Sequence, residues 1–203
     1  MRVCLYCGVS LTKEVRSAEH VVPKWIMKKY NSLKVTHTFK SIYSNQTSPR
    51  ITTPSGNQFK IKKVCKKCNN GWLSEIDSSS QPFFNRITAG DVDMIDPSEM
   101  EIASIPNFLT LLYKIHLNFF AASNFDLTEK LYSYEKFFKE RRIPDDVTVF
   151  YSVIQTPQPI NIAHNDIWNK LPKNEPFSFK TFIQIGYSTH ILVRQPQPEL
   201  PLI

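Results

Sequence analysis

The 203-residue sequence lacks a run of apolar residues long enough to cross a membrane as a helix, which requires about 20 residues. The longest apolar stretch, 105–125, is interrupted by Lys114, His116 and Asn118. The N-terminus leads directly into a cysteine pair and lacks the apolar segment of a secretion signal. These absences argue against an integral membrane protein and predict a soluble, cytoplasmic protein with no membrane contact.

Acidic residues are scarce in the first 75 positions, which contain only Glu14, Glu19 and Glu75 against 14 lysines and arginines, a net charge of +11. The rest of the chain has a net charge of −4. A front half this basic predicts a polyanionic partner, because lysine and arginine displace the counterions of nucleic acid phosphates. From charge alone, a basic surface that is merely solvated is the better explanation.

Cysteine is absent after position 68, and the four cysteines form two Cys-x2-Cys pairs, Cys4 with Cys7 and Cys65 with Cys68. Two residues between thiolates allow both sulfurs of one turn to bind the same ion, and two such turns complete the tetrahedral shell of Zn²⁺. We therefore predict a structural zinc site that joins distant parts of the sequence. The alternatives are two disulfides, which are rare in a reducing compartment, and a redox-active pair, which lacks a clear strand–helix context here.

An acidic residue precedes a histidine in the segment AEHVVPKW, at Glu19 and His20. A carboxylate binds hard divalent cations, and a neutral imidazole accepts a proton from water. Pro23 stands where a helix typically begins. Taken alone, the pair is better explained as a surface ion pair.

The order of these motifs resembles the HNH endonucleases. The first cysteine pair is followed by acid-His-apolar-apolar-Pro, and the second pair is followed at once by Asn69. The closest similarity is to the HNN subgroup with a zinc-stapled ββα-metal core, which includes phage Holliday-junction resolvases of the endonuclease VII type. The resemblance covers roughly residues 1–77.

This resemblance implies a role for each motif residue. His20 would be the general base that activates water, and Glu19 and Asn69 would bind one catalytic Mg²⁺ or Mn²⁺ ion. The four cysteines would bind structural zinc. Family members have a further Asn or His before the second cysteine pair, and Asn57 is the nearest such residue here. The lysines expected to contact DNA phosphates are Lys24, Lys62, Lys63, Lys66 and Lys67.

The fold class expected from the whole sequence is α+β. An N-terminal HNH core (1–80) carries a long inserted loop (31–59), and a linker (81–103) leads to a C-terminal α+β domain (104–203). Hydrophobic periodicity predicts that this domain has a helix beginning at Ser104–Pro106, a second helix over 128–142 and an antiparallel sheet with a turn at Gly186.

Together these features predict a metal-dependent endonuclease that hydrolyses phosphodiester bonds in DNA. Anti-phage defence, with a partner protein of that system, is expected by analogy alone. A homodimer is expected because cutting both strands commonly requires two copies of a one-strand site. The alternatives are a catalytically inactive zinc-stapled module that binds nucleic acid, and a module that binds a partner protein.

Overall fold

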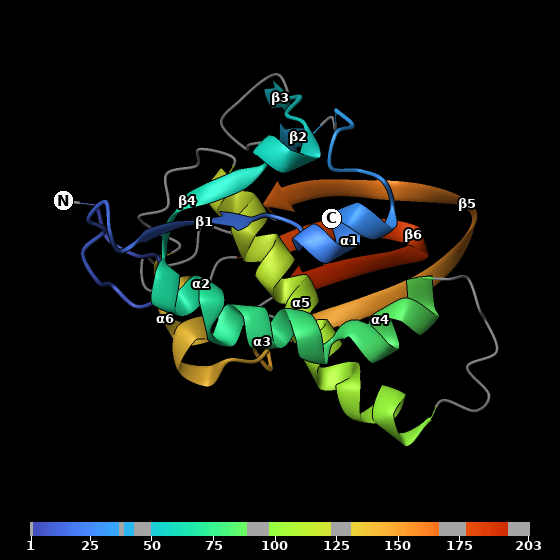
Figure 1. Cartoon of the computed structure of the whole chain (residues 1–203). Helices are drawn as coiled ribbons and strands as arrows, with labels where there is room; N and C mark the ends of the chain where they lie inside the picture. Colours follow the sequence, from blue (N-terminus) through green and yellow to red (C-terminus); the bar gives the residue numbers. More distant parts are fainter. Residues whose placement is uncertain are drawn as a thin grey trace.

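The computed structural model describes residues 2–36, 39–42, 50–88, 98–122, 131–166 and 178–194. The fold is α+β, as predicted from the sequence, with one two-stranded and one four-stranded sheet in these ranges. Figure 1 shows helices packed around both sheets. Within the described ranges, no helix has both the length and the apolar character needed to span a bilayer.

The two-stranded sheet pairs β1 (Arg16–His20) with β4 (Lys60–Cys65) in antiparallel orientation. His20 lies opposite Lys60, so the end of β1 meets the start of β4. Helix α2 (Lys66–Asn70) follows β4 directly, and α3 (Trp72–Ser79) follows α2. The chain therefore has a strand pair followed by two short helices in this segment.

The segment 31–59, expected as an inserted loop, contains regular structure. Helix α1 (Lys24–Lys29) precedes it, and the segment includes β2 (Phe39–Ile42), β3 (Arg50–Thr52) and the 3₁₀ helix η1 (Gly56–Gln58). Strands β2 and β3 join the four-stranded sheet in the order β3-β2-β5-β6. Local sequence does not reveal this, because the neighbour of β2 is β5, more than 100 residues further along the chain.

Strands β5 (Val147–Asp166) and β6 (Phe179–Arg194) form the long antiparallel pair of this sheet. The turn predicted at Gly186 is wrong, because Gly186 lies inside β6 opposite Gln158. The φ of +59° at this position and the closeness of neighbouring atoms explain why the residue is a glycine. A Cβ at this position would lie 2.5 Å from the Tyr30 hydroxyl oxygen and 2.6 Å from the Thr88 carbonyl oxygen. Gly186 therefore marks a close approach of neighbouring groups.

The region expected as a linker, 81–103, contains α4 (Gln81–Thr88) and the first turn of α5 (Glu99–Ala122). Helix α5 begins before the predicted Ser104, since Ser98 and Glu101 form a reciprocal cap. The Glu101 amide donates to Ser98 Oγ at 3.3 Å, and the Ser98 amide donates to Glu101 Oε2 at 2.8 Å. Helix α6 (Leu131–Glu140) is the second predicted helix, and the predicted residues 128–130 lie outside the described ranges.

Helix α5 crosses the middle of the molecule (Figure 1) and packs against α3, α4, β4 and β6. The polar residues that interrupt its apolar sequence, Lys114, His116 and Asn118, are completely buried. One hydrophobic cluster runs from Cys4 near the N-terminus to Leu192 in β6. The two halves of the chain therefore share a continuous core, with α5 at its centre.

Candidate functional site

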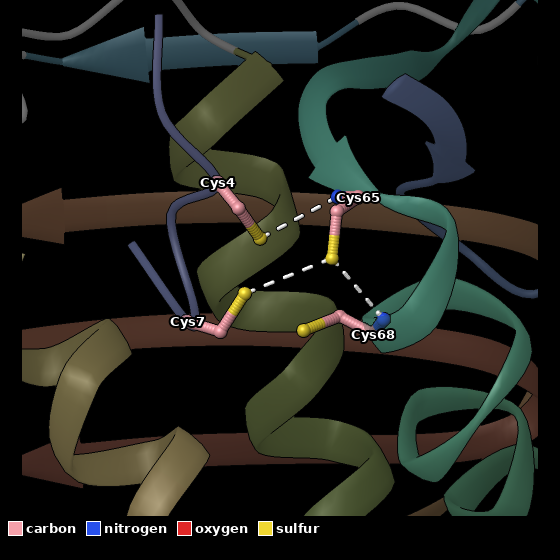
Figure 2. Close-up of side chains that lie close together, drawn as sticks. All are labelled: Cys4, Cys7, Cys65 and Cys68. Atoms are coloured by element: carbon pink, nitrogen blue, oxygen red, sulfur yellow. Dashed lines mark hydrogen bonds between the residues drawn. The ribbon is translucent and has the colours of Figure 1, made fainter. Parts of the chain in front are cut away.

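The four cysteines converge on one point, although 57 residues separate Cys7 from Cys65 in the sequence. Cys4 and Cys7 lie in the N-terminal loop, Cys65 ends β4 and Cys68 lies in α2 (Figure 2). Their sulfur atoms all lie within 4.8 Å of one another, and none forms a disulfide. Tetrahedral Zn²⁺ with four thiolates requires sulfur–sulfur distances of about 3.8 Å. The 3.7 Å between Cys7 Sγ and Cys65 Sγ fits this requirement.

Backbone amides support the two cysteine loops. The Cys65 amide donates to Cys4 Sγ at 3.4 Å, and the Cys68 amide donates to Cys65 Sγ at 3.3 Å. Gly8 closes the first loop with a φ of +71°, and its amide donates to the Cys4 carbonyl at 2.9 Å. These backbone hydrogen bonds hold the four sulfur atoms close together.

The Cys68 thiol needs a bound cation to lose its proton at neutral pH. Burial raises the pKa of Cys68 far above its usual value, and a contact with the Trp72 indole opposes this rise. Thiolates packed this closely need a positive ion among them, which Zn²⁺ supplies. The Arg141 guanidinium lies 5.9 Å from the Trp72 ring centre. A cavity of about 590 Å³ beside the cluster is lined by Cys7, Trp72 and Arg141, among others.

Glu19 is buried and faces a lysine that sequence reasoning missed. Its Oε1 lies 2.7 Å from Nζ of Lys114, which reaches it from α5. The same ammonium lies 2.7 Å from Asp77 Oδ1 and donates to the Leu73 carbonyl at 3.2 Å. The only sequence signal for this contact was a lysine that interrupts an apolar helix.

The cluster of Glu19, Asp77 and Lys114 contains two carboxylates and one ammonium. Burial raises the pKa of Asp77 to about 6, although the neighbouring Lys114 lowers it. Burial also works against the charge of Lys114, but the carboxylates of Glu19 and Asp77 outweigh it and raise the lysine's pKa. Lys114 is therefore charged at neutral pH.

His20 lies half-buried at the end of β1, beside η1. Burial lowers its pKa, the positive charges of Lys60 and Lys24 lower it further, and a side-chain contact with Asn57 opposes them. Asn57 therefore contacts the imidazole. The backbone carbonyl of His20 accepts a hydrogen bond from Asn118 Nδ2 at 3.2 Å.

Asn69 lies in α2, and its amide nitrogen donates to Ser17 Oγ at 2.7 Å. Ser17 lies on β1, two residues before Glu19, so Asn69 contacts the same strand that carries Glu19 and His20. The lysines expected to contact phosphate are all exposed, and they lie on α1 (Lys24), β4 (Lys62, Lys63) and α2 (Lys66, Lys67).

A Mg²⁺ or Mn²⁺ ion prefers free oxygen ligands, of which carboxylates are the strongest. The Glu19 carboxylate is instead paired with Lys114, at 2.7 Å from the ammonium. A divalent ion bound to the same carboxylate would lie close to this fixed positive charge and be repelled by it. Glu19 therefore does not fit the role of a metal ligand in this arrangement.

No family model, curated protein or solved structure matches this chain. The function is therefore inferred from the motif order and from the geometry described above.

Proposed function

We propose that this chain is an HNH-type endonuclease that hydrolyses phosphodiester bonds in DNA, with His20 as the general base. One observation carries the proposal. His20 ends the first strand of a strand pair followed by a helix, and four convergent cysteines connect this unit to the N-terminal loop. The contact between Asn57 and His20 supports it, because a general base needs a fixed orientation.

In the proposed reaction, a water oxygen attacks the phosphorus atom while His20 accepts the water proton. The bond from phosphorus to the 3′ oxygen breaks, and that oxygen leaves with a proton taken from solvent. The products are a 5′ phosphate and a 3′ hydroxyl. The low pKa of His20 keeps its imidazole neutral, and therefore able to accept a proton, at neutral pH.

The resemblance also implies a catalytic Mg²⁺ or Mn²⁺ ion at Glu19 and Asn69. Such an ion, when bound, offsets the negative charge that develops on the phosphate. The pairing of Glu19 with Lys114 leaves this carboxylate unsuited to hold the ion.

A groove beside the cluster of Glu19, Asp77 and Lys114 provides a path for the DNA backbone. It has a volume of about 350 Å³ and lies between α1 and α3, with Lys24, Lys28 and Asp77 among its lining residues. Lys24 also acts on the pKa of His20, which places it near the proposed base. Positive charges near the reacting phosphate attract the polyanion and screen its charge.

The decisive experiment is nicking of supercoiled plasmid by the zinc-loaded chain with Mg²⁺, with Mn²⁺ and with chelator. We expect cleavage by the unmodified protein and at least a 100-fold loss in His20→Ala, since general bases contribute about that much or more. Added imidazole should restore part of the activity of His20→Ala. Equal cleavage by both proteins would reject His20 as the base.

A second candidate, a zinc-stapled module that binds nucleic acid without cutting it, is favoured by the pairing of Glu19 with Lys114. It predicts salt-sensitive DNA binding by gel shift with no cleavage in the presence of any metal ion.

Light scattering with and without DNA tests the proposed homodimer, and a monomeric mass in both conditions would reject it.

A further inference from the structure

Every N–H donor of the Lys114 ammonium already has an acceptor in the fold. An ammonium has three N–H bonds, and Lys114 has three acceptors, at Glu19 Oε1, Asp77 Oδ1 and the Leu73 carbonyl. Its side chain is completely buried. A lysine with every donor used and no solvent contact is fixed in position by the fold.

The charges in this cluster have the arrangement of a cation site. Two carboxylates from different elements, Glu19 on β1 and Asp77 on α3, lie against one positive centre at equal distances of 2.7 Å. Convergent carboxylates are the common ligands of divalent cations in proteins. Here the positive centre is a side chain of the protein itself, delivered by α5.

Helix α5 holds both residues of the Glu19-His20 motif. Lys114 pairs with the side chain of Glu19, and Asn118, one turn later on the same helix face, donates to the carbonyl of His20. The C-terminal half of the chain therefore controls the geometry of the site in the N-terminal half.

We propose that Lys114 is the resident cation of Glu19 and Asp77, and that it positions Glu19 in place of a divalent metal ion. Glu19 and Asp77 are then a latent divalent-cation site that opens only when Lys114 is removed. This inference concerns the site of the proposed function, but it is carried by the contacts of Lys114 alone.

The test is Mn²⁺ binding to the zinc-loaded chain, followed by electron paramagnetic resonance of the free ion. Glu19→Gln removes the carboxylate charge and keeps a side chain of nearly the same shape. We expect the Mn²⁺ affinity of this variant to stay within about twofold of that of the unmodified protein. Lys114→Gln leaves the two carboxylates without their cation, and we expect Mn²⁺ affinity to rise at least about tenfold, because a nearby unit charge is lost. The double variant Lys114→Gln/Asp77→Asn should lose this gain.

Lys139→Gln is the matched control, because it removes one positive charge from an exposed position on α6. It should leave Mn²⁺ affinity unchanged. The inference is overturned if Glu19→Gln weakens Mn²⁺ binding tenfold or more, or if folded Lys114→Gln binds no tighter than the unmodified protein. If Lys114→Gln does not fold, as judged by near-ultraviolet circular dichroism, the Glu19→Gln result decides alone. Cleavage is not measured, so a failure of the proposed endonuclease activity is distinguished from a failure of this inference.

Discussion

Asn118 and His20 are connected by a hydrogen bond from the Asn118 amide to the His20 backbone carbonyl, 3.2 Å long. The side-chain oxygen of Asn118 accepts a second bond from the Tyr6 hydroxyl, at 2.6 Å. Tyr6 lies between the first two cysteines. One buried amide on α5 therefore joins the first cysteine loop to the end of β1, and so connects the cysteine cluster with the proposed base.

Replacing this amide should destabilise the fold. Asn118→Leu leaves the buried Tyr6 hydroxyl and the part-buried His20 carbonyl without their partner, and a buried group left unpaired costs about 1–3 kcal/mol. We expect the free energy of unfolding in urea to fall by about 2–4 kcal/mol. Asn161→Leu, at an exposed position on β5, is the control and should change it by less than about 0.5 kcal/mol. Equal effects of the two variants would contradict the bridging role of Asn118.

The cysteine cluster predicts one tightly bound zinc per chain and a fold that depends on it. Metal analysis should give one zinc per chain, and Co²⁺ substitution should give the intense visible bands of a tetrahedral tetrathiolate ion. Cys68→Ser should lose the metal and several kcal/mol of stability. Cys68→His keeps a ligand that zinc accepts, and should retain part of both. Zinc bound equally well by Cys68→Ser would show that these sulfurs are not its ligands.

The convergence of the four cysteines could be predicted from the sequence, because it depends on two short motifs. A spacing of two residues brings both sulfurs of one cysteine pair to the same side of a turn. A tetrahedral zinc ion needs four ligands, and therefore both pairs. The structure places the acid-His motif at the end of β1, and the catalytic role expected of His20 stays a prediction. A site whose residues belong to short motifs can be predicted without knowledge of the fold.

The partners of Glu19 could not be predicted in this way. Lys114 is 95 positions away in sequence, and a lysine within an apolar helix is compatible with either a solvent-facing or a buried position. Only the packing of α5 against β4 and α3 brings its ammonium to the carboxylates. The turn predicted at Gly186 was wrong for the same reason. The groups that lie close to this glycine, Tyr30 and Thr88, belong to distant segments of the chain.

The two glycines with positive φ should respond differently to alanine. Gly8 has a φ of +71° with open space around its Cβ position, so Gly8→Ala should cost only the backbone strain, about 1–2 kcal/mol. Gly186→Ala adds a clash with the Tyr30 hydroxyl and the Thr88 carbonyl at 2.5 and 2.6 Å. We expect Gly186→Ala to lower the melting temperature clearly more than Gly8→Ala, and the reverse order would contradict the close packing of β6 on Tyr30 and α4.

His190 should make the fold sensitive to mild acid. Burial lowers its pKa to about 3 in the folded chain, whereas an unfolded histidine titrates near about 6.5. Between these values the unfolded chain binds a proton that the folded chain does not, so the free energy of unfolding falls by about 1.4 kcal/mol per pH unit as pH decreases. At neutral pH both states are uncharged and the residue has no such effect.

Urea unfolding between about pH 7 and pH 5 measures this dependence. His190→Phe keeps a ring beside Phe108 and Tyr151, which contact the imidazole, but cannot titrate. Its stability should decline less steeply with falling pH than that of the unmodified protein. Parallel slopes for the two proteins would mean that His190 is accessible to protons in the folded state.

The exposed lysines on β4 should contribute to DNA binding through phosphate contacts. Lys62→Gln/Lys63→Gln removes two charges from the basic half of the chain, so affinity should fall and the slope of log K against log salt should decrease in magnitude by about 2 for duplex DNA. Lys139→Gln/Lys180→Gln removes the same number of charges from exposed positions in the acidic half and should have little effect. Fluorescence anisotropy of a labelled duplex over a range of salt concentrations, in the presence of chelator, measures both quantities. An equal loss in the two double variants would show that net charge, and not the β4 surface, attracts the DNA.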